Sequence, residues 1–300
     1  MRLGIDFGGT KIEGVVLDAK GSERARARVP TPRNDYDGCI GAIHRLALDL
    51  EGRVGERIER VGIGVPGSVD RETGRVSGGN ATWLSGHDFR ADLVAALDRP
   101  VAVANDANCF ALCEATDGAG EGAAVVFGAI LGSGVGGGIV VHGRLIEGMN
   151  AIAGEWGHVP LPTPRDDERP GPVCSCGIPG HVESWLSGRS LAADYARRIG
   201  QDPAEAPPAP EVIARAASGE VAAEETLRRF EDRLGRALAV VVNLLDPDVI
   251  VLGGGMSNVA RLYETVPPRI ATHVFGGRCR TRLARNRHGD SSGVRGAAWL

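Results

Sequence analysis

The chain has 300 residues, 43% of them hydrophobic, which is enough for one large domain or two of ordinary size. A formal net charge of −4 and a pI near 6.0 provide no basic surface for nucleic acid, so we expect no nucleic-acid partner. No apolar run is long enough to span a membrane, and the first residues follow a strand pattern instead of that of a secretory leader. The six cysteines are scattered along the chain, which is typical of reduced thiols and predicts a cytoplasmic protein.

The N-terminal segment predicts two strands joined by the turn Gly8-Gly9-Thr10. An ordinary hairpin turn would explain these glycines. In the alternative interpretation, the backbone N–H groups of the turn, the Thr10 hydroxyl and the Lys11 ammonium bind a nucleotide phosphate. Asp6 lies in an otherwise apolar strand, where an unpaired carboxylate is costly. That cost favours the second interpretation, with Asp6 facing the Mg²⁺ ion that accompanies the phosphates.

A predicted strand at 101–104 leads directly into Asn105 and Asp106, and a helix is expected from there to about Glu114. Aspartate at such a junction is commonly the helix N-cap, and the residues by themselves favour that role for Asp106. The alternative role is catalytic, because the carboxyl ends of strands in α/β sheets face the ligand crevice. There Asp106 would accept the proton of a hydroxyl group. Other elements predicted before it are strands at 24–29 and 61–65, a helix at 37–54 and a short helix after Asp88.

The most glycine-rich stretch is Leu131–Ile139, in which five of nine residues are glycine. It lies between two apolar runs, 125–131 and 139–141, that predict buried strands. Glycines in such a turn let backbone N–H groups converge on an anion. A bulged, glycine-rich hairpin without any ligand is the alternative.

A chelating knuckle is predicted at Cys174, Cys176 and His181, since two cysteines and a histidine fall within eight residues with turn formers between them. His158 could complete a tetrahedral Cys₂His₂ zinc site. Free thiols and a surface histidine are the alternative. Glu155 and His158 are three residues apart and project the same way from a helical turn, and their small apolar neighbours argue against a solvated face.

The remainder of the chain predicts a helix from Glu183 through Leu191, a linker at 201–210 and a long amphipathic helix over 222–245. A buried strand at 249–252 ends in Gly253-Gly254-Gly255, where the backbone can approach a ligand closely. A small helix closes the chain. A strand, a glycine turn and a second strand therefore occur twice, near Gly8 and near Gly134, which indicates a coarse internal doubling.

The order of these motifs resembles the ROK family of sugar kinases and repressors over essentially the whole chain. The runs at 80–84, 105–109 and 288–296 look most like its bacterial fructokinase (mannofructokinase) branch. The resemblance implies an actin-like, ribonuclease-H-like α/β ATPase fold with two lobes, mixed sheets and flanking helices. We expect a small lobe of residues 1–118, completed by the C-terminal helix 290–300, and a large lobe of residues 119–289. The motifs that carry the resemblance are Asp6-Phe7-Gly8-Gly9-Thr10-Lys11, Gly132-Ser133-Gly134-x-Gly136, Gly154-Glu155-x-Gly157-His158, Cys174-x-Cys176-Gly177 and Val251-Leu252-Gly253-Gly254-Gly255.

The resemblance also implies a role for each matching residue. ATP and Mg²⁺ would be held by Asp6, Gly8, Gly9, Thr10, Lys11, Gly132, Ser133, Gly134 and Gly136, with Gly253, Gly254 and Gly255 flanking the adenosine. The sugar would be held by Gly67, Asn80, Asn105, Asp106, Glu155, His158 and Glu183, with Asp106 as general base. Structural zinc would be held by His158, Cys174, Cys176 and His181, the last standing where the family has a third cysteine. A homodimer is implied as well.

We therefore expect an ATP-dependent hexose kinase acting on the 6-hydroxyl of fructose, with mannose as a second candidate substrate. N-acetylglucosamine kinase or glucokinase of the same family is the alternative within the enzyme class. A repressor or a non-catalytic sugar sensor is the alternative of another class. The first strand begins at Leu3, which leaves no room for an N-terminal DNA-binding segment, and intact Asp6 and Asp106 argue against a catalytically inactive sensor.

Overall fold

The computed structural model describes residues 1–70, 72–77 and 82–300. They form two compact units, one of Met1–Gly122, Gly138–Gly154 and Arg287–Leu300, the other of Ala123–Gly137 and Glu155–Asn286. The predicted lobes, 1–118 with 290–300 and 119–289, stay a prediction, and each unit is described by itself below. None of the helices in the described part of the chain has the length and apolarity needed to cross a bilayer.

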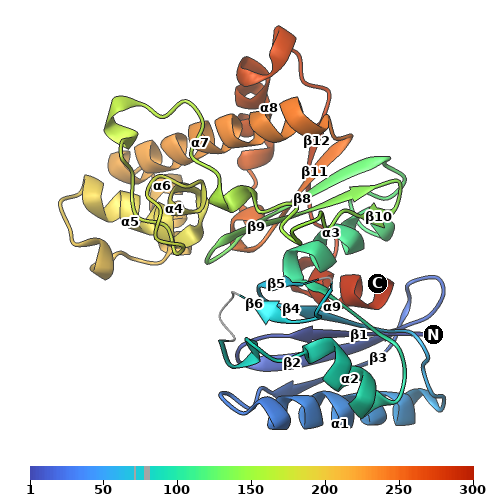
Figure 1. Cartoon of the computed structure of the whole chain (residues 1–300). Coiled ribbons are helices and arrows are strands. Elements are labelled where there is room, and N and C mark those ends of the chain that lie inside the picture. The colour runs from blue at the N-terminus through green and yellow to red at the C-terminus, as the bar shows by residue number, and fades with distance from the viewer. Residues whose placement is uncertain (71, 78–81) are drawn as a thin grey trace. The chain divides into compact units, whose positions relative to one another are not determined.

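The sheet of the first unit has the strand order β3-β2-β1-β4-β7 (Figure 1). Its first three strands are antiparallel neighbours, and β4 and β7 continue the sheet parallel to β1. The strands are β1 (Arg2–Phe7), β2 (Lys11–Leu17), β3 (Glu23–Pro30), β4 (Val61–Val65) and β7 (Val101–Asn105).

Helices cover both faces of this sheet. On one face, buried residues of α1 (Tyr36–Val54) and α2 (Phe89–Leu97) join the apolar core formed by β1 and β4. On the other face, α9 (Ser292–Trp299) packs against β2 through Val294 and Ala298 and also contacts α3 (Asp106–Thr116). Figure 1 shows α1 and α2 together on the side of the sheet away from α9. The short strands β5 (Ser68–Val69) and β6 (Val76–Ser77) form a separate ribbon.

The second sheet repeats the pattern of the first, with the order β10-β9-β8-β11-β12. As in the first sheet, three strands that are consecutive in the chain lie next to one another, and two strands from later in the chain extend the sheet. Strand β11 is parallel to both β8 and β12. The expected internal doubling is thereby confirmed. The strands are β8 (Val125–Leu131), β9 (Val135–Val141), β10 (Arg144–Leu145), β11 (Val249–Gly253) and β12 (Arg282–Arg285).

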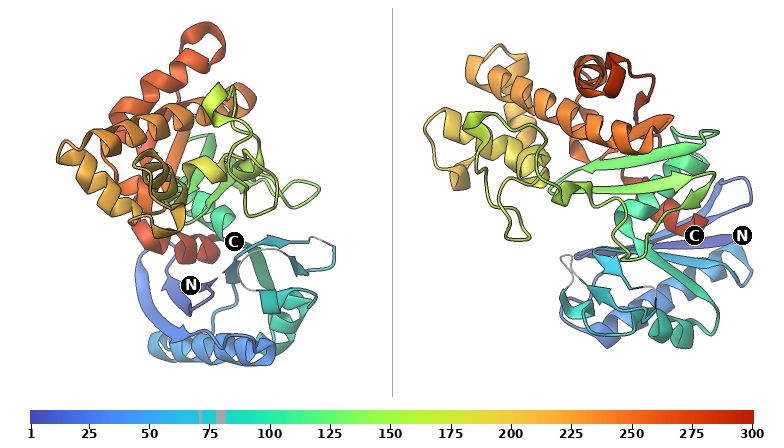
Figure 2. Two further views of the ribbon diagram at one scale, coloured as in Figure 1. Left: turned by 90° about the vertical axis from the view of Figure 1, so that its left-hand side faces the viewer. Right: turned by 45° about the horizontal axis from the view of Figure 1, so that its top comes forward.

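A group of helices around α7 (Val221–Leu245) completes the second unit. The long helix predicted over 222–245 is confirmed, and its apolar stripe, including Leu227, Phe230 and Leu234, is buried. Neighbouring helices α5 (Gly188–Arg198), α6 (Ala209–Ala217) and α8 (Leu262–His273) contact it. Figure 2 shows from two further sides that α5, α6 and α7, coloured yellow to orange, lie side by side.

Several of these elements were not predicted, among them α6, α8 and β12. Helix α8 contains Pro267 and Pro268 in its interior, where proline normally breaks a helix. Helix α6 begins inside the segment predicted as a linker, because Pro208 and Pro210 stand at its N-terminus, where proline is tolerated. Strand β12 is short and rich in arginine.

The single helix predicted from Glu183 is two helices, α4 (Glu183–Leu186) and α5, because Ser187 accepts a hydrogen bond from Ser190 N–H and caps a new helix.

Candidate functional site

Two carboxylates come together at the C-terminal edge of the first sheet. Asp6 lies near the end of β1, and Asp106 begins α3 directly after β7. Burial, together with the negative charges of Asp106 and Glu13, raises the pKa of Asp6 to about 6, while Lys11 opposes the shift. Two such carboxylates, one of them desolvated, form an electrostatic environment that a divalent cation would relieve.

The helix that carries Asp106 is capped by its neighbour. The Asn105 side-chain oxygen accepts hydrogen bonds from Ala107 N–H at 2.8 Å and Asn108 N–H at 3.3 Å. The N-cap role considered for Asp106 is therefore wrong, because Asp106 is already the first helical residue. The Asn105 amide also donates to the carbonyl of Gly67 at 2.7 Å, so two residues predicted to bind sugar contact each other. Asn80, which was also predicted to bind sugar, lies outside the described residues.

The turn between β1 and β2 is fixed by a residue that sequence reasoning missed. Gly8 N–H donates to the Lys11 carbonyl at 3.0 Å and closes the turn. Thr31 donates its hydroxyl to the Gly8 carbonyl at 2.7 Å and its N–H to the Thr10 carbonyl at 3.1 Å. The Lys11 ammonium lies 3.4 Å from the buried carboxylate of Glu13. A threonine after a strand carries no sequence signal for such a role.

In the second unit, the glycine loop between β8 and β9 is clamped by the start of α5. Gly188 N–H donates to the Gly132 carbonyl at 2.8 Å, and Arg189 Nε donates to the Ser133 carbonyl at 2.8 Å. Within the loop, Gly132 N–H donates to the Gly134 carbonyl at 2.9 Å. These bonds fix the loop conformation before any ligand binds.

A second glycine segment lies directly against this loop. Gly254 has φ +73°, and a Cβ there would lie 2.6 Å from the Leu131 carbonyl oxygen and 2.9 Å from Gly132 N. No other residue fits that position without displacing the backbone. The structure thus brings together the two glycine segments, at Gly132 and at Gly254, that were predicted from different parts of the chain to hold one nucleotide.

The predicted zinc ligands also come together. One donor atom from each of His158, Cys174, Cys176 and His181 lies within 4.8 Å of all the others. His158 Nδ1 is 3.5 Å from Cys174 Sγ, and His181 Nδ1 is 3.2 Å from Cys176 Sγ. Donors that share a tetrahedral zinc ion at ~2.0 to 2.3 Å lie roughly 3 to 4 Å apart, and both of these pairs match that spacing. The other ring nitrogen of His158, Nε2, lies 3.9 Å from a carboxylate oxygen of Glu155.

Glu183 connects the cysteine–histidine cluster to the glycine loop. One carboxylate oxygen accepts from the hydroxyl of Ser175, between the two cysteines, at 2.6 Å. The other accepts from Val135 N–H, at the end of the glycine loop, at 2.9 Å. Although burial opposes ionisation, these hydrogen bonds lower the pKa of Glu183 and keep it charged. A Cβ on Gly134 would lie 2.7 Å from the same carboxylate, so any larger residue there would displace the Glu183 side chain. Ser175 is a further contact that sequence reasoning missed.

Known proteins resemble this chain along its whole length. The model of the ROK family matches residues 2–300. The N-acetyl-D-glucosamine kinase of Pectobacterium atrosepticum is 41% identical over 100% of this chain and 98% of its own, and that of Escherichia coli O157:H7 is 40% identical over 100% and 99%. The solved structure of the ROK hexokinase from Thermus thermophilus has a TM-score of 0.89 at 31% identity, over 99% of this chain and 96% of that chain.

A ROK family glucokinase from Streptomyces griseus, solved in complex with glucose and AMPPNP, has a TM-score of 0.79 at 28% identity, over 99% of this chain and 97% of that chain. These neighbours confirm the expected actin-like α/β fold with mixed sheets flanked by helices.

The raised pKa of Asp6 predicts a pH-dependent stability. Because its pKa is about 6 in the folded state against an ordinary 3.8, stability should fall as pH rises through this window and stay lowered above it. Asp6→Asn should therefore be more stable than the wild type at pH 8, by up to about 3 kcal/mol, and this gain should disappear below pH 4. Urea denaturation without divalent cations measures both differences. An equal difference at the two pH values would contradict the assignment.

Proposed function

The chain belongs to the ROK family, and from that premise we propose that it is an ATP-dependent sugar kinase whose substrate is N-acetyl-D-glucosamine. Support for this substrate comes from the two N-acetyl-D-glucosamine kinases that align with the entire chain at 41% and 40% identity. From the sequence alone we expected a fructokinase, with N-acetylglucosamine kinase as an alternative. These relatives favour that alternative, which therefore replaces the fructokinase branch in our proposal.

In this proposal, Asp106 is the general base. Phosphoryl transfer requires in-line positioning and charge stabilisation more than covalent catalysis. Asp106 would accept the proton of the attacking 6-hydroxyl, and Asp6 would bind the Mg²⁺ ion that neutralises the phosphoryl group. The observation that carries this assignment is the pair of neighbouring carboxylates at the C-terminal edge of the first sheet, with Asn105 serving as helix cap in place of Asp106.

The glycine segments of the second unit would hold the nucleotide. The clamp on Gly132 and Ser133 supports this role, because a loop that is ordered in advance loses little conformational entropy when it binds phosphate. Gly254, packed against the same loop, would flank the adenosine. We also assign phosphate binding to the turn at Gly8–Lys11.

The residues that we propose for holding the sugar are Gly67, Asn80, Asn105, Glu155, His158 and Glu183. Burial raises the pKa of Glu155, and the nearby His158 opposes that shift. Glu183 Oε1 accepts from the Ser175 hydroxyl and the Cys174 thiol, whereas Oε2 accepts from Val135 N–H and has a second lone pair for a sugar hydroxyl.

We assign zinc a structural role, held by His158, Cys174, Cys176 and His181. When bound, it would tie together the knuckle and the turn that carries His158. With Nδ1 toward the metal cluster and Nε2 toward Glu155, His158 could serve the metal and the sugar with different ring nitrogens. The expected homodimer stays a prediction.

A substrate panel tests the proposed activity. Purified protein with ATP and Mg²⁺ should phosphorylate N-acetyl-D-glucosamine with a higher kcat/KM than fructose, mannose, glucose or N-acetyl-D-mannosamine. Coupled detection of ADP measures all five rates. A preference for fructose would restore the fructokinase branch, and no turnover with any sugar would refute the kinase proposal.

Asp106→Asn should reduce kcat by ~10² to 10⁴-fold, because it removes the base while preserving side-chain shape. Sugar affinity, measured by calorimetry, should stay within a few-fold of the wild-type value. Turnover at the wild-type rate would remove Asp106 from its assigned role.

Purified protein should contain about one zinc ion per chain, measured by elemental analysis. Cys176→Ala should lose the metal and melt at a lower temperature, because the ligands would no longer hold the knuckle together. Cys279→Ala is the matched control, since Cys279 lies outside the cluster, and it should retain zinc. Metal-free protein whose melting temperature does not respond to added zinc would contradict the assignment.

A further inference from the structure

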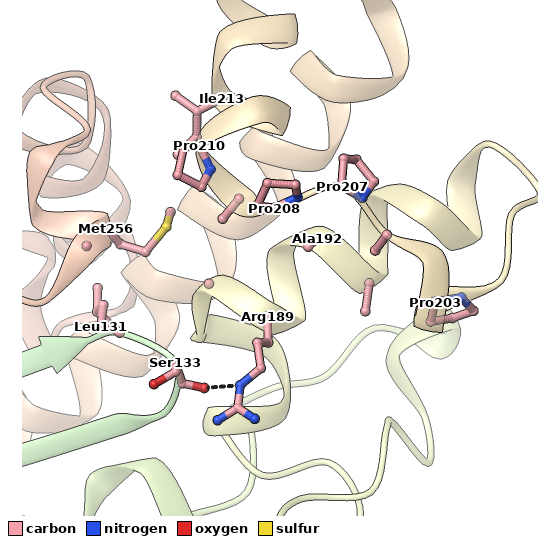
Figure 3. Close-up of a pocket in the computed structure, with 16 residues that line it drawn as sticks. Leu131, Ser133, Arg189, Ala192, Pro203, Pro207, Pro208, Pro210, Ile213 and Met256 are labelled. Atoms are coloured by element: carbon pink, nitrogen blue, oxygen red, sulfur yellow. Dashed lines mark hydrogen bonds between the residues drawn. The ribbon is translucent and has the colours of Figure 1, made fainter. Parts of the chain in front are cut away.

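A cavity of about 570 Å³ opens beside the glycine loop in the second unit. Its volume lies in the range of ligand-binding pockets. Leu131, Gly132 and Ser133 line one end, and residues from the segment 203–213 line the other (Figure 3). Gly255 and Met256 contribute a further wall, so both glycine segments border the same cavity.

The wall away from the glycine loop is apolar. It consists of Pro207, Pro208, Pro210 and Ile213, and Ala192 of α5 also lines the cavity. Among the lining residues in the described part of the chain, the polar side chains are Ser133 and Arg189, and both belong to the loop end. Figure 3 shows the Arg189 side chain directed away from the prolines, with its Nε bonded to the Ser133 carbonyl.

The backbone of this wall has few hydrogen-bond donors as well. Proline has no N–H, and four of the lining residues are Pro203, Pro207, Pro208 and Pro210. Ala206 N–H is directed to the Pro203 carbonyl at 3.4 Å. Ala209 stands in the first turn of α6, where a backbone N–H has no partner within the helix. A single donor of this kind can bond to a ring nitrogen of adenine or to the 6-oxo group of guanine equally well.

How strongly an enzyme discriminates between nucleobases depends on whether its site forms hydrogen bonds to the base. A site built to hydrogen-bond one group rejects an analogue by roughly 10⁴ to 10⁵, whereas apolar contact separates similar ligands by about 10- to 200-fold. We propose that this cavity binds the nucleobase through apolar contact and tolerates different purines, so that the protein uses GTP and ITP as phosphoryl donors besides ATP. This inference rests on the proposed kinase activity, in which the adjoining loop holds the phosphates.

Calorimetry with ATP, GTP and ITP on the full chain tests the inference without needing the sugar. The three dissociation constants should agree within about 200-fold, the limit for discrimination by apolar contact, and so should the three kcat/KM values with N-acetyl-D-glucosamine. A preference for ATP larger than this would overturn the inference while leaving the kinase proposal intact. Binding of all three nucleotides without phosphorylation of any sugar in the panel would refute the kinase proposal and retain the tolerant pocket. Failure of all three nucleotides to bind would refute both.

A substitution tests whether the nucleobase binds in this cavity. Ala193 lines the cavity and is half-buried, so Ala193→Leu should reduce the available space without disrupting a core. The affinities for ATP, GTP and ITP should each fall by about 10-fold or more, while that for inorganic triphosphate, which has no base, stays unchanged. Ala222→Leu on α7, outside the cavity, is the matched control and should bind all four ligands like the wild type. Unchanged nucleotide affinity in Ala193→Leu would overturn the proposed location.

Discussion

The hydrogen bonds that the Glu183 carboxylate accepts from Val135 N–H and from Ser175 hold the second unit's site together. Through them, one side chain determines the position of the glycine loop relative to the cysteine knuckle at 174–181. The helix that starts five residues later adds the bonds from Gly188 and Arg189 to the same loop. The seven residues from Glu183 to Arg189 therefore hold the glycine loop in its conformation. The position of the loop then depends on how firmly the knuckle at 174–181, which precedes these residues in the chain, is held.

The first unit follows the opposite principle, because its site is built at a cost to stability. Asp6 occupies a buried strand position next to another carboxylate, and its raised pKa measures how unfavourable its charge is there. An apolar residue would suit the strand better. Retention of a desolvated carboxylate is typical of functional sites, where charge is arranged for a ligand and not for folding.

Local motifs made much of this arrangement predictable. The glycine segments, the knuckle and the long helix α7 each have a pattern that is visible over a few residues. Elements that depend on tertiary packing were missed, such as α8 with its two internal prolines and the arginine-rich β12. The roles of Asn105 and Ser175 were unpredictable for a related reason, since their partners Gly67 and Glu183 are set by the fold and not by spacing. The sugar preference depends on pocket shape, which short motifs do not encode.

The bond from Asn105 to Gly67 has a consequence for fidelity. Asn105 uses its amide nitrogen to hold the Gly67 carbonyl and its oxygen to hold the first amides of α3, so neither partner can shift alone. If Gly67 contacts the sugar as proposed, a sugar that displaces Gly67 would also move the carboxylate next to Asn105. Under that proposal, selectivity would arise in the rate of the chemical step, because an ill-fitting sugar would bind and still fail to react.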